Sequence, residues 1–197
     1  MTQFHSSSPS RRPIISGKAF LAWSCAPVLA FGLLLGQANA AGSDSSEPPK
    51  PTETTQKCKD GQMWDKDSKT CVSAQQGMFD DDTLYDAARE LAYDGQYENA
   101  IDLLQLAGNS DDPRILNYLG FSNRKAGRMD VGMGYYKEAL KRDPDYILAR
   151  SYMGQAYLQQ NQRNAARDQL LEIEARGGKG TWAHTALVMA MKNASTY

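Results

Sequence analysis

The chain has 197 residues, of which 41% are hydrophobic and 23% charged, and this composition fits one globular domain with additional segments. The formal charge of −1 is unevenly distributed, because residues 1–40 carry Arg11, Arg12 and Lys18 and no acidic side chain. Residues 41–197 hold 19 of the 22 basic and all 23 acidic side chains, a net charge of −4. Such a mildly acidic body argues against a nucleic acid partner.

Residues 1–40 have the pattern of a secretory signal peptide. A basic, polar start precedes the apolar run AFLAWSCAPVLAFGLLLG at 19–36, and Ala38 and Ala40 occupy the small positions of an A-x-A cleavage site. We expect cleavage after Ala40 and a periplasmic or secreted mature chain. The pattern leaves two matters open. The apolar run nearly suffices for a retained membrane anchor, and export can follow the general or the twin-arginine route.

Residues 41–57, AGSDSSEPPKPTETTQK, contain almost no apolar side chain to bury. Serine, threonine, proline and charged residues in this proportion are typical of disordered segments. We predict a disordered linker here.

Cys58 and Cys71 bracket the segment CKDGQMWDKDSKTCV at 58–72. In an oxidising compartment two such thiols are expected to form a disulfide. Turn-forming residues flank a short apolar stretch around Trp64, which predicts a small hairpin closed by the bond. The segment resembles short disulfide loops of exported bacterial proteins. Trp64 either packs over the disulfide or the next domain, or serves as an exposed binding platform.

From Asp80 onward the sequence has helical periodicity, and capping and glycine signals divide it into seven helices joined by short connections. Asp80, Asp112 and Thr181 stand at predicted helix starts, and Gly95 and Gly127 at predicted ends. The pattern predicts an all-α array of antiparallel helices. The predicted helices span about 81–94, 97–107, 113–126, 130–141, 146–160, 163–176 and 181–193.

A spaced pattern recurs along these helices with a period of 32 to 34 residues. In the copy at 113–146 it consists of Leu116, Leu119, Gly120, Gly132, Tyr136, Ala139 and Pro144. Met153, Gly154, Tyr157, Ala166 and Leu170 follow in the next copy, and Leu84, Ala87, Ala88, Leu91, Ala100, Leu104 and Ala107 precede. Three tandem copies resemble the tetratricopeptide repeat. Asn123, Arg150, Ile173 and Gly178 depart from its usual residues.

The resemblance implies a superhelix of three helix hairpins within residues 80–193. The repeats are expected at about 81–112, 113–146 and 147–180, with a capping helix at 181–193 whose inward face carries Trp182, Leu187, Val188 and Met191. Small residues at Gly120 and Gly132 would let the two helices of one hairpin approach closely, and we expect alanine to serve there as well. Gly134 has no evident role.

The same resemblance predicts a binding scaffold. The first helix of each hairpin lines a concave groove in this family, and residues of those helices that lie off the packing positions are expected to face it. The carboxylate-clamp residues of chaperone-binding members are not matched. The predicted groove residues, for each of which plain solvation is the alternative, are Tyr85, Arg89, Asn117, Phe121, Arg124, Ser151, Gln155 and Gln159.

We therefore expect an exported adaptor that binds a peptide or partner protein, with no cofactor, no metal and no catalytic activity. After cleavage His184 is the remaining histidine, and no nucleophile with a paired base or phosphate-binding loop is evident. The alternative function is a structural protein that contacts the cell wall or a glycan through the Cys58–Cys71 loop and Trp64.

Overall fold

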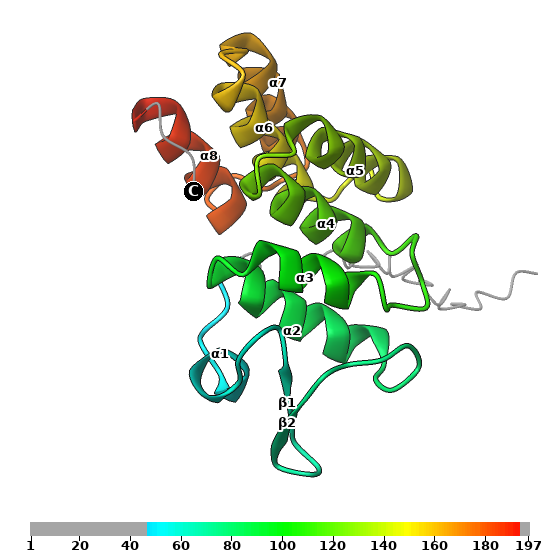
Figure 1. Ribbon diagram of the computed structural model, residues 1–197. Helices are drawn as coiled ribbons and strands as arrows, with labels where there is room; N and C mark the ends of the chain where they lie inside the picture. The colour runs from blue at the N-terminus through cyan, green and yellow to red at the C-terminus, as the bar shows by residue number, and fades with distance from the viewer. Residues whose placement is uncertain (1–46, 194–197) are drawn as a thin grey trace, which may run out of the picture. The chain divides into compact units, whose positions relative to one another are not determined.

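The computed structural model describes residues 47–193, and the predicted signal peptide lies outside them. Seven helices run from Asp81 to Asn193, as the periodicity predicted (Figure 1). Three antiparallel hairpins account for the first six, since the most extensive helix–helix contacts join α2 to α3, α4 to α5 and α6 to α7. The helices are α2 (Asp81–Tyr93), α3 (Tyr97–Leu104), α4 (Pro113–Lys125), α5 (Met129–Arg142), α6 (Ile147–Gln159), α7 (Arg163–Ala175) and α8 (Trp182–Asn193).

The same backbone motif joins the two helices of each hairpin. Near the end of the first helix, a carbonyl accepts a hydrogen bond from the amide five residues later, at Leu91 to Gln96, Asn123 to Arg128 and Tyr157 to Gln162. This bond belongs to the Schellman motif, which needs a residue with positive φ. Gly95 and Gly127, both with φ of 87°, and Asn161 with φ of 60° take that place. The shared motif shows that the three hairpins are structural repeats.

Helix starts follow the predicted capping residues. The Asp80 carboxylate accepts a hydrogen bond from the Thr83 amide at 2.7 Å, and Asp112 accepts one from the Arg114 amide at 2.8 Å. The Thr181 hydroxyl accepts from the His184 amide at the start of α8. These side chains satisfy backbone N–H groups that have no partner within the helix.

The close approach of α4 and α5 explains the two glycines at their crossing. A Cβ atom at Gly132 would lie 2.7 Å from the Gly120 carbonyl oxygen, and one at Gly120 would lie 2.7 Å from the Tyr136 ring. The expectation that alanine would serve at these positions is therefore wrong for Gly132, because backbone atoms cannot move aside as a side chain can. Gly134 has open space around it.

The C-terminal helix α8 packs on α6 and α7 and covers that end of the stack. Its buried face consists of Leu187 and three alanines at 183, 186 and 190. The predicted inward face is thus correct for Leu187, while Trp182, Val188 and Met191 are half-buried. Small residues prevail because α8 lies close to α6, where a Cβ at Gly154 would meet the Leu187 side chain at 2.7 Å.

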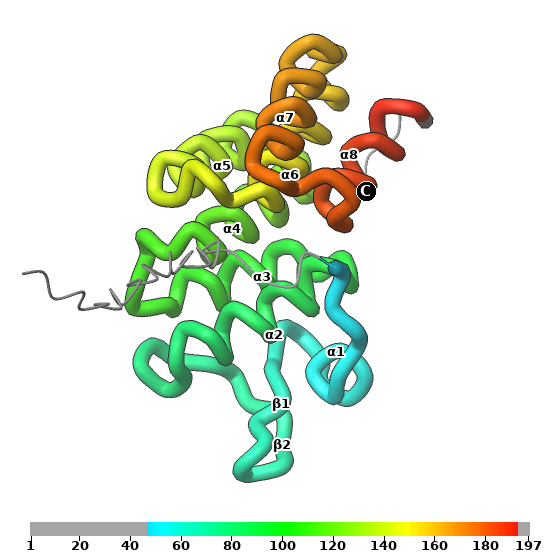
Figure 2. The backbone as a smooth tube through the Cα atoms, turned by 180° about the vertical axis from the view of Figure 1, so that it is seen from behind, coloured from blue at the N-terminus to red at the C-terminus, as the bar shows by residue number. Residues whose placement is uncertain are grey.

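The predicted disulfide hairpin lies at the α2 end of the fold, away from α8 (Figure 2). Strands β1 (Met63–Asp65) and β2 (Thr70–Val72) pair antiparallel, with Trp64 opposite Cys71. Cys58 and Cys71 are bonded, with Cα atoms 5.4 Å apart. Met63 is 2% exposed and belongs to the same apolar core as the residues of α2. The hairpin therefore closes the first repeat.

The prediction of a disordered linker is wrong for residues 47–57, and residues 41–46 lie outside the described part. Residues 53–57 form the short helix α1 (Glu53–Lys57), which begins after Thr52. The Glu90 carboxylate of α2 accepts hydrogen bonds from the amide and hydroxyl groups of both Thr52 and Thr55. This segment, which we call the N-terminal strap (residues 47–57), is ordered by polar contacts that compensate for its lack of apolar side chains.

Acidification is expected to release the N-terminal strap. Burial alone would raise the pKa of Glu90, but the hydrogen bonds from Thr52 and Thr55 hold it below its ordinary value. A lowered folded-state pKa means that the stabilisation is complete above about pH 5 and is lost as the pH falls through the folded-state pKa. Amide exchange at Thr55 should then lose about tenfold in protection.

The control for this prediction is Glu90→Gln, which cannot titrate. At pH 6 its strap amides should be less protected from exchange than those of the wild type. Their protection should change little further down to pH 3. The Thr83 amide donates to the Asp80 carboxylate, so its protection reports the protonation of a different carboxylate in the same experiment. Unchanged protection at Thr55 in the variant would contradict the role given to Glu90.

Candidate functional site

The eight residues predicted to line a groove lie on α2, α4 and α6, the first helices of the three hairpins. We call this set the first-helix face. The spacing of four residues in Tyr85–Arg89, Asn117–Phe121 and Ser151–Gln155–Gln159 places the members of each helix on one side of it. Seven of the eight are buried, and Gln159 is exposed. That they line a groove stays a prediction.

Arginines of the first-helix face contact tyrosines of neighbouring helices. The Arg89 Nε donates to the Tyr118 hydroxyl at 3.0 Å, and its guanidinium also donates to the Glu47 carbonyl of the N-terminal strap. Arg124 donates from Nε to the Tyr136 hydroxyl at 3.2 Å and from Nη1 to Gln159 at 3.1 Å. Both arginines thus have structural contacts, so truncating either one would change stability as well as any binding.

An aromatic ladder, which the sequence analysis did not identify, connects the first helices. One ring from each of α2, α4, α6 and α8 takes part, and neighbouring rings meet edge to face. Their centroids are 5.5, 6.1 and 6.4 Å apart in the order Tyr85, Tyr118, Tyr152 and Trp182. In the sequence, the ladder could have been recognised from the 34-residue spacing of Tyr118 and Tyr152. Edge-to-face pairs favour this geometry and fix the relative positions of successive hairpins.

Phe121 and Tyr93 extend the aromatic contacts at the C-terminal ends of α2 and α4. Their rings stack with centroids 5.4 Å apart, and Phe121 also lies 4.9 Å from Tyr152. The hydroxyl oxygens of Tyr93 and Tyr152 are 2.7 Å apart and share a hydrogen bond. Burial raises the pKa of Tyr118 and of Tyr152, so both phenols stay neutral and act as hydrogen-bonding groups.

Ser151 is engaged by the capping helix. Its hydroxyl donates to the Ala183 carbonyl of α8 at 2.7 Å, and the side chain is fully buried. The contact holds α8 on α6. Ser151 therefore contributes to the closure of the stack, in addition to the groove role predicted for it.

Three other members of the first-helix face carry buried polar atoms without a hydrogen-bond partner. They are Asn117 Oδ1, Arg124 Nη2 and both amide atoms of Gln155. Gln155 and Asn117 are 0% exposed, and Arg124 is 3% exposed. A buried polar atom without a partner costs about 1–3 kcal/mol, and most such atoms in folded proteins are satisfied. The first-helix face thus retains hydrogen-bonding capacity that the described residues do not use.

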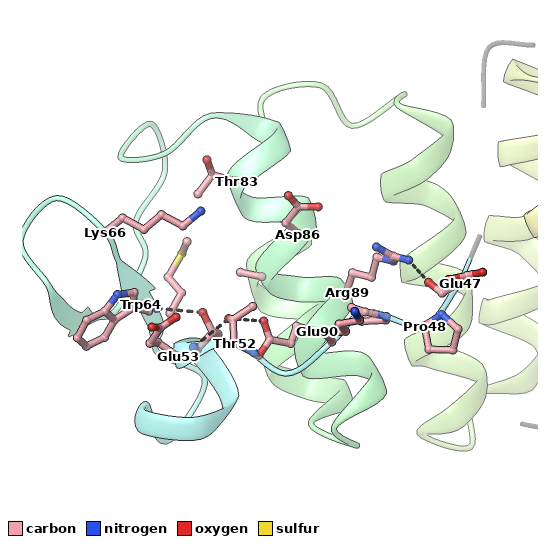
Figure 3. Close-up of a pocket in the computed structure, with 15 residues that line it drawn as sticks. Glu47, Pro48, Thr52, Glu53, Trp64, Lys66, Thr83, Asp86, Arg89 and Glu90 are labelled. Atoms are coloured by element: carbon pink, nitrogen blue, oxygen red, sulfur yellow. Dashed lines mark hydrogen bonds between the residues drawn. The ribbon is translucent and has the colours of Figure 1, made fainter. Parts of the chain in front are cut away.

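A second candidate site is a hollow of about 660 Å³ between the N-terminal strap, the hairpin and α2 (Figure 3). Trp64 and Lys66 of the hairpin lie on one side, and Asp86 and Glu90 of α2 on another. The Lys57 ammonium lies 4.7 Å from the centre of the Trp64 ring, which is half-buried. The hollow combines charges of both signs, and the glycan contact predicted for Trp64 stays a prediction.

Residues 47–193 contain no group of three or more His, Cys, Asp or Glu side chains placed to hold a metal ion. In the same range, no helix combines the length and the apolar character that crossing a bilayer requires. His184 Nε2 lies 3.1 Å from a Glu174 oxygen, a contact that ties α8 to α7.

Comparison with known proteins identifies one family. Residues 123–187, from the end of α4 into α8, match the family model described as Tetratricopeptide repeat. No curated protein and no solved structure matches the chain significantly. Together with the stack of helix hairpins, the matched segment supports an all-α fold of the tetratricopeptide-repeat type.

Proposed function

We propose that the protein is an exported adaptor that binds an extended peptide or partner segment on the first-helix face. Export is inferred from the pattern of residues 1–40 and is in keeping with the Cys58–Cys71 disulfide. The repeat architecture supports a protein as the partner, because stacked hairpins present one long surface made of successive first helices.

The observation that carries the proposal is the set of unsatisfied amide atoms on this face. Gln155 has a free donor and a free acceptor, and Asn117 has a free acceptor. A peptide group offers the matching acceptor and donor, so an extended segment along α4 and α6 would satisfy both side chains. Phe121 and Tyr85 supply the apolar contacts that anchor such segments.

Gln155→Leu separates binding from folding. The leucine keeps a similar volume and removes two unsatisfied polar atoms, so the free energy of unfolding should stay unchanged or rise by about 1 kcal/mol. Capture of partners by the immobilised protein from an extract of the exported fraction should fall about tenfold. Urea unfolding followed by circular dichroism gives the first quantity, and quantitative mass spectrometry of bound proteins the second.

Asn164→Leu is the matched control, because it makes the same amide-to-leucine change at an exposed site on α7. Its capture should equal that of the wild type. Equal loss in both variants would indicate a nonspecific effect of added apolar surface. A Gln155→Leu protein that keeps full capture would contradict the proposed binding face.

A further inference from the structure

The N-terminal strap contacts the first-helix face through its first residue. The backbone carbonyl of Glu47 accepts a hydrogen bond from the Arg89 guanidinium (Figure 3). Arg89 also donates from Nε to the Tyr118 hydroxyl at 3.0 Å, so it lies where α2 and α4 meet. An extended segment that runs from α4 to Tyr85, one turn from Arg89 on α2, would pass this position. The chain's own backbone therefore contacts part of the surface proposed for the partner.

Polar contacts hold the strap on α2. The Glu90 carboxylate accepts from the Thr52 amide at 2.7 Å, from the Thr52 hydroxyl at 2.6 Å and from the Thr55 amide at 3.1 Å. Glu90 is 6% exposed, whereas the strap residues from 47 to 53 are all exposed except the half-buried Pro49. Hydrogen bonds can be exchanged for equivalent bonds at a small net cost. The strap can therefore leave α2 without disturbing the apolar core.

The disulfide keeps the strap close to this surface when its polar contacts open. Cys58 follows the strap directly and is bonded to Cys71 of β2. Thr54, the buried residue of the strap, accepts a hydrogen bond from the Trp64 amide of β1 at 3.2 Å. A segment tethered over so short a distance has an effective concentration on the order of millimolar. A partner peptide at micromolar concentration has to compete with it.

We propose that the N-terminal strap is an internal competitor, which occupies the α2 end of the first-helix face and limits access of the partner. The inference rests on the proposed function, because it requires a partner segment that uses this face. A backbone carbonyl of that segment would replace the Glu47 carbonyl on Arg89, while the Cys58 end of the strap stays bonded. Partner binding and strap release are then coupled. A change that raises the released fraction of the strap strengthens partner binding by the same factor.

The test measures how much of a random octapeptide pool, acetylated and amidated at its ends, the immobilised protein retains. Thr52→Val/Thr55→Val keeps the side-chain shape and removes two hydroxyl donors to Glu90, so it should retain about ten times more peptide than the wild type. Glu90→Gln weakens the same contacts from α2 and should act in the same direction. Thr70→Val/Thr185→Val makes the matched change at two exposed sites and should retain as much as the wild type. Circular dichroism confirms that each variant remains folded.

Hydrogen exchange tests the coupling without any substitution. At a pool concentration that saturates the wild type, the Thr52 amide, which donates to Glu90, should lose about tenfold in protection. Retention of the pool with unchanged protection at Thr52 would overturn the internal competitor and leave the proposed function standing. Equal retention by the wild type and both strap variants would do the same. Retention by none of the proteins would contradict the proposed function and this inference with it.

Discussion

Replacing Gly132 with alanine is expected to lower the free energy of unfolding by about 1–3 kcal/mol. The added methyl group would lie 2.7 Å from the Gly120 carbonyl oxygen and 3.0 Å from both the backbone nitrogen and the Cβ atom of Arg124. Two of these three atoms belong to the α4 backbone, so relief requires α4 and α5 to separate. Urea unfolding monitored by circular dichroism measures the change.

Gly134→Ala, two residues further along α5, is the matched control. Nothing lies within 4 Å of its Cβ position, and the residue is exposed. Here alanine only restricts the unfolded chain and favours the helix, so stability should rise by about 0.5–1 kcal/mol. The same chemical change on one helix thus has opposite expected signs. Equal effects at the two positions would contradict the close crossing of α4 and α5.

The helix hairpins were predictable because the residues that specify them are close together in the sequence and recur in each repeat. Each contains a small residue at the crossing and a residue tolerant of positive φ, spaced by 32 to 34 residues, and the first two hairpins also begin with a capping aspartate. Asn161 shows how far the pattern extends, since asparagine replaces glycine at the third Schellman motif and keeps φ at 60°. Side-chain identity alone could not show that Gly132 needs glycine while Ala100 and Ala166 serve in the sister repeats.

The N-terminal strap was not predictable, because its order depends on one acceptor far away in the sequence. Composition correctly shows that residues 47–57 have little to bury, but Glu90 satisfies the threonines from 35 to 38 residues away. A glutamate in a helix is ordinarily assigned to solvent, and nothing in its neighbours indicates such a role.

The contacts within the first-helix face were not predictable. Its eight residues lie on α2, α4 and α6, where the repeat pattern placed them, and their role in binding stays a prediction. Whether a polar side chain there finds a partner depends on three-dimensional neighbours, which differ between Ser151, bonded to α8, and Gln155, which has no partner. The aromatic ladder was missed because its rings lie outside the repeat positions that define the family pattern.

Removing the disulfide is expected to uncouple the N-terminal end of the stack from the rest. The bond closes a loop with a sequence separation of 13 residues, for which the chain-entropy model gives about 3 kcal/mol. The hairpin has two strands of three residues and one deeply buried side chain, Met63, so it has little other stabilisation. The double variant Cys58→Ala/Cys71→Ala should therefore lose the hairpin at 25 °C.

The destabilising effect of losing the disulfide should decline along the chain from the hairpin towards α7, because each repeat is stabilised mainly by its neighbours. Met63 packs on the core that includes α2, and Trp64 donates its amide to Thr54 in the N-terminal strap. Hydrogen exchange should therefore accelerate strongly at 47–72, moderately in α2 and α3, and little in α6 and α7. Treating the wild type with a reducing agent should reproduce this gradient. Uniform acceleration through α7 would instead show that the hairpin belongs to a single cooperative unit with all three repeats, in which case it could not serve as a cap for the first repeat alone.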